Sequence, residues 1–407
     1  MGNILFFAAC FAFCLLFLWK SGRLGPGRAR WAAAAVLLLA FGLRYACMDY
    51  ETLDYQNFLT RWVDYFRFSG GLRAMGDSVG NYNIPYLFYL ALCSYTDYPD
   101  LYLIKYFSVA ADIALAAGVA ELVECCGGRP GRAGFGFCAC LLLPTVILNG
   151  ALWGQCDSVY VALAVWAVAL GLEGRSRASL ACITLSFAFK LQAVFFFPVF
   201  FILLVQGRVR WKDLWMVPLT YTLSVSPALL AGRNFWDTLL IYVNQADSVG
   251  TGLNYNSSSL YAFYPGGGDE AALARAGILA AFAFCAVLLG VLFLRRKKAD
   301  STALAAAFTL AAICIPLLLP HMHDRYFFGA DVLSLVMAVM APVLWPLPLL
   351  CSFASLLGYH AYLKMRYLLP MRYGAAALAA AAVMLIAFMI LRVREKPEDA
   401  GGQLDQR

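Results

Sequence analysis

Residues 317–333, LLLPHMHDRYFFGADVL, place a short polar cluster between two apolar runs. The cluster consists of His321, His323, Asp324 and Arg325. One fixed cation with two imidazole donors suits a phosphate or pyrophosphate leaving group. Alternatively, the basic side chains satisfy the carbonyl groups at the end of the preceding helix. A zinc site is not expected, because His-x-His-Asp supplies too few well-placed ligands.

Residues 48–83 form a second polar stretch, in which acidic side chains alternate with aromatic ones. Four residues recur at the spacing of an amphipathic helix that lies along a membrane surface: Asp54, Phe58, Trp62 and Tyr65. The acidic side chains of this stretch, which include Asp49, either face water or supply a base for catalysis. Helical spacing fits both interpretations.

Three further charged residues stand out because their surroundings are apolar. Asp112 lies within a long apolar run, so it is either neutral or partnered by a group from another helix. Asp157 follows Trp153 and Gln155 at the start of a helix, where it caps the helix, contacts substrate or does both. Lys190 is the one charge in its apolar run and either snorkels to the surface or binds a phosphate.

The composition determines which kind of element must position these groups. Of the 407 residues, 62% are hydrophobic and 14% are charged, whereas soluble domains are about 25% charged. Repeated apolar runs predict an all-α polytopic membrane protein without a soluble domain longer than a loop. The net charge of +7 is scattered over short loops, so nucleic acid is not an expected partner. Most of the 13 cysteines lie in apolar runs and are expected to be small hydrophobic residues.

The basic residues of the short loops predict the orientation of the chain, because such loops stay in the cytoplasm. Thirteen predicted spans then lead from an outside N-terminus to an inside C-terminus: 3–19, 31–47, 101–123, 134–150, 157–172, 179–190, 191–206, 213–231, 274–294, 301–319, 327–344, 347–363 and 375–392. This count requires that residues 84–95, IPYLFYLALCSY, do not cross the membrane completely. The two short spans that meet at Lys190 are expected to be kinked or half-inserted.

With this orientation, the unusual polar residues gather on the external face. The predicted external segments are 48–83, 149–157, 231–273 and 320–325. Residues 1–392 are expected to form a single transmembrane domain in the plasma membrane, and residues 393–407 a short cytoplasmic tail. Charged groups near the membrane are costly and usually functional. The residue types therefore predict an external cavity with an acid near one wall and cations near another, which fits group transfer from a lipid phosphate.

Four stretches between about residue 49 and residue 330 resemble a known family. They are LDYQNFLTRW with GGLRAMGDSVGNYNIPYLFYLAL, ILNGALWGQCDSVY, SFAFKLQAVFFFPV and HMHDRYFF. The chain resembles the GT-C superfamily of polytopic glycosyltransferases, specifically the bacterial proteins related to the GPI-anchor mannosyltransferases. This resemblance implies a bundle of about 11–13 transmembrane helices and a first external loop with juxtamembrane helices.

The sequence departs from the family pattern at three places. Ile84 and Pro85 stand where family members often have two prolines, and Asp324 stands where a glutamate is usual. The stretch GLNYNSSSLYAF is similar to the family's external NAPN segment, with Asn256 retained and Ser259 in place of the second asparagine. The first departure affects a turn, and the others alter contacts rather than the chemistry.

The resemblance implies an inverting transferase that moves a hexose, mannose, from a polyprenyl-phosphate donor to an acceptor hydroxyl on the external face. An acidic residue of the first external loop is the general base in such enzymes, and Asp54 stands at the matching place. The residues expected to bind the donor phosphate are Lys190, Arg325, His321 and His323. Substrate contacts are expected from Asp49, Trp153, Gln155, Asp157, Asn256 and Asp324. The acceptor is a glycan, lipid or protein; no cofactor is expected, and a divalent metal is not favoured.

Two other functions compete with this interpretation. A secondary transporter would use the intramembrane acids as proton relays, but it would show internal repeats that this sequence lacks. A polysaccharide polymerase or ligase would act on lipid-linked glycans through external loops with different motifs. Release of polyprenyl phosphate distinguishes a transferase from a transporter.

Overall fold

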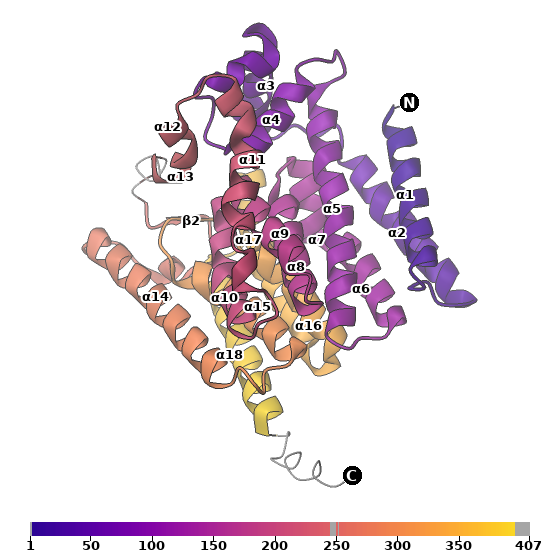
Figure 1. Cartoon of the computed structure of the whole chain (residues 1–407), viewed down its shortest axis with the longest axis vertical. Helices are drawn as coiled ribbons and strands as arrows, with labels where there is room; N and C mark the ends of the chain where they lie inside the picture. The colour runs from indigo at the N-terminus through magenta and orange to yellow at the C-terminus, as the bar shows by residue number, and fades with distance from the viewer. Residues whose placement is uncertain (1, 245–249, 251, 395–407) are drawn as a thin grey trace.

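The structure, a computed structural model, describes residues 2–244, 250 and 252–394 of the chain. These residues fold into a bundle of α-helices with a single two-stranded parallel bridge (Figure 1). The described part of the chain is thus the all-α polytopic membrane protein that the composition predicts.

The N-terminal half contains helices α1 to α10 and four short π or 3₁₀ turns. Their bounds are α1 Gly2–Lys20, α2 Arg28–Ala46, η1 Tyr55–Leu59, α3 Thr60–Phe68, η2 Gly71–Gly76, α4 Ile84–Cys93, α5 Asp100–Cys125, α6 Pro130–Leu142, α7 Pro144–Ile147, η3 Leu148–Trp153, α8 Asp157–Leu172, α9 Ser176–Phe189, η4 Leu191–Phe196 and α10 Phe197–Val205.

The C-terminal half contains the remaining helices and both strands. Their bounds are η5 Trp211–Asp213, α11 Met216–Leu230, α12 Phe235–Leu239, α13 Ile241–Asn244, β1 Asn254–Tyr255, η7 Leu260–Phe263, α14 Glu270–Leu294, α15 Ser301–Leu318, β2 Met322–His323, α16 Phe328–Met340, η8 Pro342–Leu344, α17 Pro346–Leu363 and α18 Arg372–Arg394.

Helix length separates complete spans from partial ones. Among the described residues, seven helices are long and apolar enough to cross a membrane, or eight if the bent pair formed by Pro130–Leu142 and Pro144–Trp153 counts as one span. Five further apolar helices contain 10–17 residues. One of these is α4, whose 10 residues extend about 15 Å against a hydrocarbon core of about 30 Å. Residues 84–93 are therefore too short to span, as their sequence predicts.

The break expected at Lys190 is present in the structure. Lys190 ends α9 in an extended conformation (φ −153°, ψ 133°), and the short turn η4 leads from it into α10. A similar break lies before Pro144, where the chain bends by 52°. The missing amide hydrogen of Pro144 removes a helical hydrogen bond at that point. Both breaks leave backbone ends beside polar side chains rather than in lipid.

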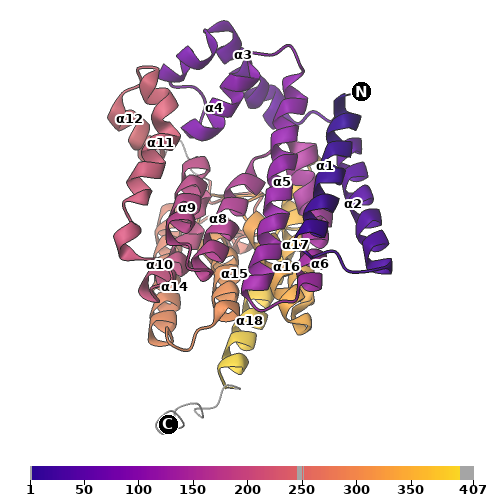
Figure 2. The same ribbon diagram turned by 45° about the vertical axis from the view of Figure 1, so that its right-hand side comes forward.

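Helices α5, α8, α15 and α16 form the buried centre of the bundle, and small residues allow them to pack closely. In α5, a Cβ atom at Gly118 would lie 3.0 Å from the ring of Trp166 on α8. Close backbone approach of this kind is the usual means of packing helices in a membrane. Helix α14 lies at the edge of the bundle, and α3 and α4 form a cap above α5 (Figures 1 and 2).

The helix predicted in the first external loop is present but buries another face. Leu59, Val63 and Phe66 are buried in a separate apolar cluster with α4 and α11, whereas Phe58 and Tyr65 of the predicted stripe are 48% and 39% exposed. Phe58 and Tyr65 thus lie on the exposed face of this helix, whose first turn, η1, is a π-turn. Asp54 precedes this turn.

Candidate functional site

The Asp54 side chain is held by the segment that connects η3 to α8. Its Oδ2 accepts hydrogen bonds from Trp153 Nε1 at 2.8 Å and from Gln155 Nε2 at 2.7 Å. Tyr362 of α17 lies near this carboxylate, and its ring stacks on Trp153 with 4.4 Å between centroids. Three predicted site residues therefore meet, together with Tyr362, which the sequence did not reveal.

The backbone around Asp54 is fixed by a buried lysine. Lys105 Nζ, on α5, donates to the carbonyl oxygens of Cys47 and Met48 at 2.9 Å and of Tyr50 at 2.6 Å. These carbonyls follow the end of α2, so one ammonium group caps that helix and orders the start of the external loop. Thr52 then donates to the Trp153 carbonyl at 3.3 Å. A lone lysine near the start of an apolar helix was the sequence signal for this anchor.

The cationic side of the site is Arg325, in the turn between β2 and α16. Its Cζ lies 5.4 Å from the centroid of the Trp153 ring, within the range of a cation–π contact. Its Nε is 3.8 Å from Asp157 Oδ2, and its Nη1 is 3.4 Å from Asp324 Oδ1. The Nε is buried and has no hydrogen-bond partner among the described residues. The guanidinium group therefore keeps donor capacity for an anion.

Lys190 reaches the same cluster but is already paired. Its ammonium group forms an ion pair with Asp157 Oδ1, and both side chains are buried. Asn149 Nδ2 donates to the other Asp157 oxygen at 2.8 Å. Cys156, and not Asp157, occupies the N-cap position of α8, and it makes no side-chain capping bond. The Asp157 carboxylate instead binds Lys190 and Asn149. Asn149 was not among the predicted residues.

The two histidines precede Arg325 in the sequence, at the point where β1 and β2 pair in parallel. The His323 ring stacks on Tyr255 with 4.8 Å between centroids. Burial, with Arg325 and Lys190 nearby, lowers the pKa of His323 to about 4, so it is neutral at pH 7. His321 Nδ1 lies 2.7 Å from the Gly252 carbonyl oxygen, which directs this nitrogen toward the backbone. Asn256 Oδ1 accepts from Tyr367 at 2.6 Å.

Asp324 is a buried carboxyl group with an altered pKa. Burial raises the pKa of Asp324 to about 7; Arg325 opposes this shift, and the carboxylates of Asp54 and Asp157 add to it. Asp324 therefore changes charge near neutral pH. With Asp324 neutral, two carboxylates and two cations remain in the cluster.

Two predicted residues lie apart from this cluster. Asp49 is exposed and accepts a hydrogen bond from Tyr102 at 2.8 Å. Asp112 is fully buried and binds the guanidinium group of Arg44, with distances of 3.0 Å to Nε and 2.9 Å to Nη2. Ser158 also donates to Asp112. Asp112 thus has a partner from another helix, one of the two alternatives that the sequence left open, although the sequence did not identify Arg44.

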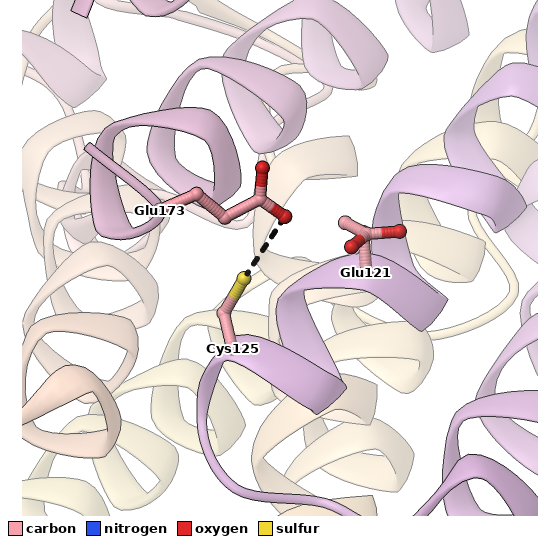
Figure 3. A group of neighbouring side chains, drawn as sticks. All are labelled: Glu121, Cys125 and Glu173. Carbon is pink, nitrogen blue, oxygen red and sulfur yellow. Dashed lines mark hydrogen bonds between the residues drawn. The ribbon is translucent and has the colours of Figure 1, made fainter. Parts of the chain in front are cut away.

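Among the described residues, one group of side chains has the geometry of a metal site, and it lies far from Asp54. Glu121 and Cys125 of α5 approach Glu173, which follows α8 (Figure 3). Arg23 pairs with Glu121 at 2.7 Å, and Arg175 with Glu173 at 3.5 Å. The helical rise places this end of α5 about 30 Å from Lys105. Arg23 also pairs with Glu124 at 2.6 Å, so these carboxylates already take part in ion pairs at this end of α5.

The comparison with known proteins identifies the family. The family model described as "Glycosyltransferase family 87" matches residues 81–320, more than half of the chain. The matched range contains Trp153, Gln155, Asp157 and Lys190. No curated protein matches the sequence. The chain belongs to glycosyltransferase family 87.

Proposed function

We propose that the chain is an inverting GT-C enzyme, related to the GPI-anchor mannosyltransferases, that uses a polyprenyl-phosphate-linked hexose. The sugar is mannose, and it is transferred to an acceptor hydroxyl on the external face of the plasma membrane. One observation carries the proposal: the Trp153 indole binds Asp54 through Nε1 and has the Arg325 guanidinium group 5.4 Å from its ring centroid. A carboxylate that can act as a base and a cation thus contact the same indole, a proximity that group transfer from a phosphate requires.

Asp54 is the general base of the proposed reaction. The acceptor oxygen attacks the anomeric carbon, and its proton passes to the Asp54 carboxylate. The bond between the anomeric carbon and the phosphate oxygen breaks, and its electron pair leaves with polyprenyl phosphate. Trp153 and Gln155 both donate to Oδ2, which holds the carboxylate in one orientation. Such a base contributes roughly 10²–10⁴-fold to the rate.

Arg325 is the main group for the leaving phosphate. The donor phosphodiester carries one negative charge and the product monoester gains a second, so the transition state needs a nearby cation. The Arg325 Nε has no hydrogen-bond partner among the described residues. Lys190 neutralises Asp157, which would otherwise repel the phosphate. His323, whose pKa is lowered to about 4, is neutral at pH 7 and adds no charge beside Arg325.

The orientation rests on the loops at the other end of the bundle. Arg129–Arg132, Arg175–Arg177 and Arg295–Lys298 lie at helix ends that the positive-inside rule places in the cytoplasm. The Asp54 end of α5 then faces outward. Polyprenyl-phosphate sugars are the activated donors suited to that side, where sugar nucleotides are absent.

The test is transfer from a radiolabelled polyprenyl-phosphate mannose to membranes of a deletion strain. Asp54→Asn is expected to lower the rate by about 10²–10⁴-fold while the thermal midpoint stays close to that of the wild type. Asp49→Asn is the matched control, because Asp49 is an exposed acid of the same loop, and it should retain transfer. Full activity in Asp54→Asn with loss in Asp49→Asn would reassign the base. If the wild type never releases polyprenyl phosphate, the donor class is wrong.

A further inference from the structure

A cavity away from Asp157 and Arg325 lies between the loop after η2 and the segment that joins α11 to α12. Its volume is about 330 Å³, within the range of small-ligand sites. It is lined by Gly76, Ser78, Gly80, Gly232, Arg233, Asn234, Asp237 and Ile241. Most of these residues are polar or expose their backbone to the cavity.

Arg233 and Asp237 share this cavity without pairing. Within the described part of the chain, Arg233 has no carboxylate within 4.0 Å, and its one side-chain hydrogen bond is from Nη1 to the Asp77 carbonyl oxygen at 3.4 Å. The Asp237 backbone amide is bound by Asn234 at 3.1 Å, but its carboxylate makes no hydrogen bond within the same residues. The Asp237 carboxylate attracts the half-buried Arg233 guanidinium without a hydrogen bond to it. Both groups therefore keep hydrogen-bonding capacity that a ligand can satisfy.

Glycines set the shape of the cavity. A Cβ atom at Gly76 would lie 2.5 Å from the Ala231 carbonyl oxygen, so the two walls meet backbone to backbone. Gly80 has a φ of +62°, and a Cβ atom there would lie 2.6 Å from the Trp62 ring. Side chains at these positions would force the walls apart or fill the space.

A chain of direct contacts links the cavity to the proposed base. Gly80 packs on Trp62, whose ring lies 5.7 Å from that of Tyr82. The Tyr82 hydroxyl donates to Gln155 Oε1 at 3.1 Å, and Gln155 donates to Asp54. Trp62 and Tyr82 therefore connect the wall of the cavity to the residues that hold Asp54.

Exposed apolar residues beside the cavity indicate its depth relative to the membrane. Leu230 is 87% exposed, Phe235 47% and Trp236 65%. Aromatic residues of this kind gather where the bilayer meets water. The cavity thus lies at a level that the head group of a lipid-linked molecule reaches.

We propose that this cavity binds a non-reacting sugar of the acceptor glycan and so holds the acceptor hydroxyl at Asp54. The inference rests on the proposed transferase function. Sugar hydroxyls both donate and accept hydrogen bonds, so one sugar ring satisfies Arg233, Asp237 and Ser78 together. A bare phosphate fits less well, because Asp237 would repel it. Lipid-linked and free glycans share this chemistry, and the experiment separates them.

The experiment measures transfer of radiolabelled mannose from polyprenyl phosphate to acceptors prepared from a deletion strain. One arm uses the organic-solvent extract, which contains lipid-linked glycans, and the other uses the aqueous extract. We expect Arg233→Gln and Asp237→Asn each to raise the half-saturating amount of acceptor by roughly 10-fold, with the donor KM unchanged. Arg61→Gln is the matched control, because Arg61 is exposed on α3 and does not line the cavity.

The outcomes separate the two proposals. If the wild type transfers sugar and both cavity variants keep the wild-type acceptor dependence, the cavity does not bind the acceptor. An increase in the donor KM instead of the acceptor requirement would assign the cavity to the donor and overturn the inference. If the wild type transfers no sugar from this donor, the proposed function fails first. A thermal midpoint near that of the wild type must accompany any loss, and Ser78→Ala provides a milder variant with the same expected direction.

Discussion

Two buried ion pairs in this protein differ in how many of their guanidinium nitrogens have hydrogen-bond partners. At the middle of the bundle, Asp112 binds two nitrogens of Arg44, and the remaining Arg44 nitrogen donates to the carbonyl oxygens of Leu141 and Ala40. Beside Trp153, the Nε of Arg325 has no hydrogen-bond partner among the described residues and lies 3.8 Å from Asp157, and Nη1 of Arg325 lies 3.4 Å from Asp324.

We interpret this difference as one between a structural pair and the proposed binding site. The Arg44 pair is saturated and fully buried, so it has nothing left to offer a ligand, and its role is to join α2, α5 and α6. The Arg325 cluster is unsaturated and its guanidinium side chain is 16% exposed. A buried charge without full compensation is costly, and such costs are retained where a ligand completes the site.

The largest expected effect comes from breaking the saturated pair. Arg44→Leu leaves Asp112 buried without its cation, which should lower the free energy of unfolding by about 3–5 kcal/mol. Melting in detergent, followed by tryptophan fluorescence, measures this loss. The double variant Arg44→Leu with Asp112→Leu should recover much of it, because no lone charge remains. A well-folded double variant that transfers no sugar would show that the pair is not merely structural.

Substitution of Arg325, which lacks a full set of hydrogen-bond partners, should lower the rate of sugar transfer more than the stability of the fold. Arg325→Gln is expected to lower the rate of transfer by about 10²–10³-fold and to leave the melting temperature near that of the wild type. Arg325→Lys should restore little, because a lysine cannot reproduce the planar fork that contacts both phosphate and Trp153. Destabilisation as large as that of Arg44→Leu would remove the distinction between the two pairs.

The smallest expected effect concerns pH. Because the pKa of Asp324 is raised to about 7, lowering the pH from about 8 to about 6 protonates it and leaves Arg325 free for the donor phosphate. The donor KM should therefore fall several-fold over this range. His323, with a pKa lowered to about 4, stays neutral throughout.

Asp324→Asn provides the control for this pH effect. It should give the low donor KM at both pH values and should also flatten the pH dependence of stability. A carboxyl with a raised folded pKa destabilises the fold progressively as the pH rises from about 4 to about 7. An unchanged KM profile in Asp324→Asn would assign the titration to another group.

The sequence predicted the elements better than the partners within them. The break at Lys190 was predictable because the apolar runs on either side are too short to span. The partner of Asp112 was not, because Arg44 lies 68 residues earlier. The ion pair of Lys190 with Asp157 likewise joins residues 33 apart, so Lys190 read alone suggested a free phosphate ligand.

The local backbone conformation of the first external loop was the other feature that the sequence did not predict. The stripe of Asp54, Phe58, Trp62 and Tyr65 predicted an amphipathic helix but not the π-turn at Tyr55–Leu59 or the burial of the neighbouring Leu59 and Val63. Side chains of an interfacial helix are apolar on more than one face, so hydrophobic pattern alone did not choose between them.

The anchors of the Asp54 loop also determine when this loop can form during synthesis. Lys105 binds the Met48 carbonyl from 57 residues downstream, and the Trp153 carbonyl accepts from Thr52 across 101 residues. The loop leaves the ribosome before either anchor exists, so the N-terminal helices enter the membrane without an ordered Asp54. The nascent chain therefore positions Asp54, the proposed base, only after α5 and the turn before α8 have been inserted. An N-terminal fragment that ends before Asp100 would be inactive however well its helices insert.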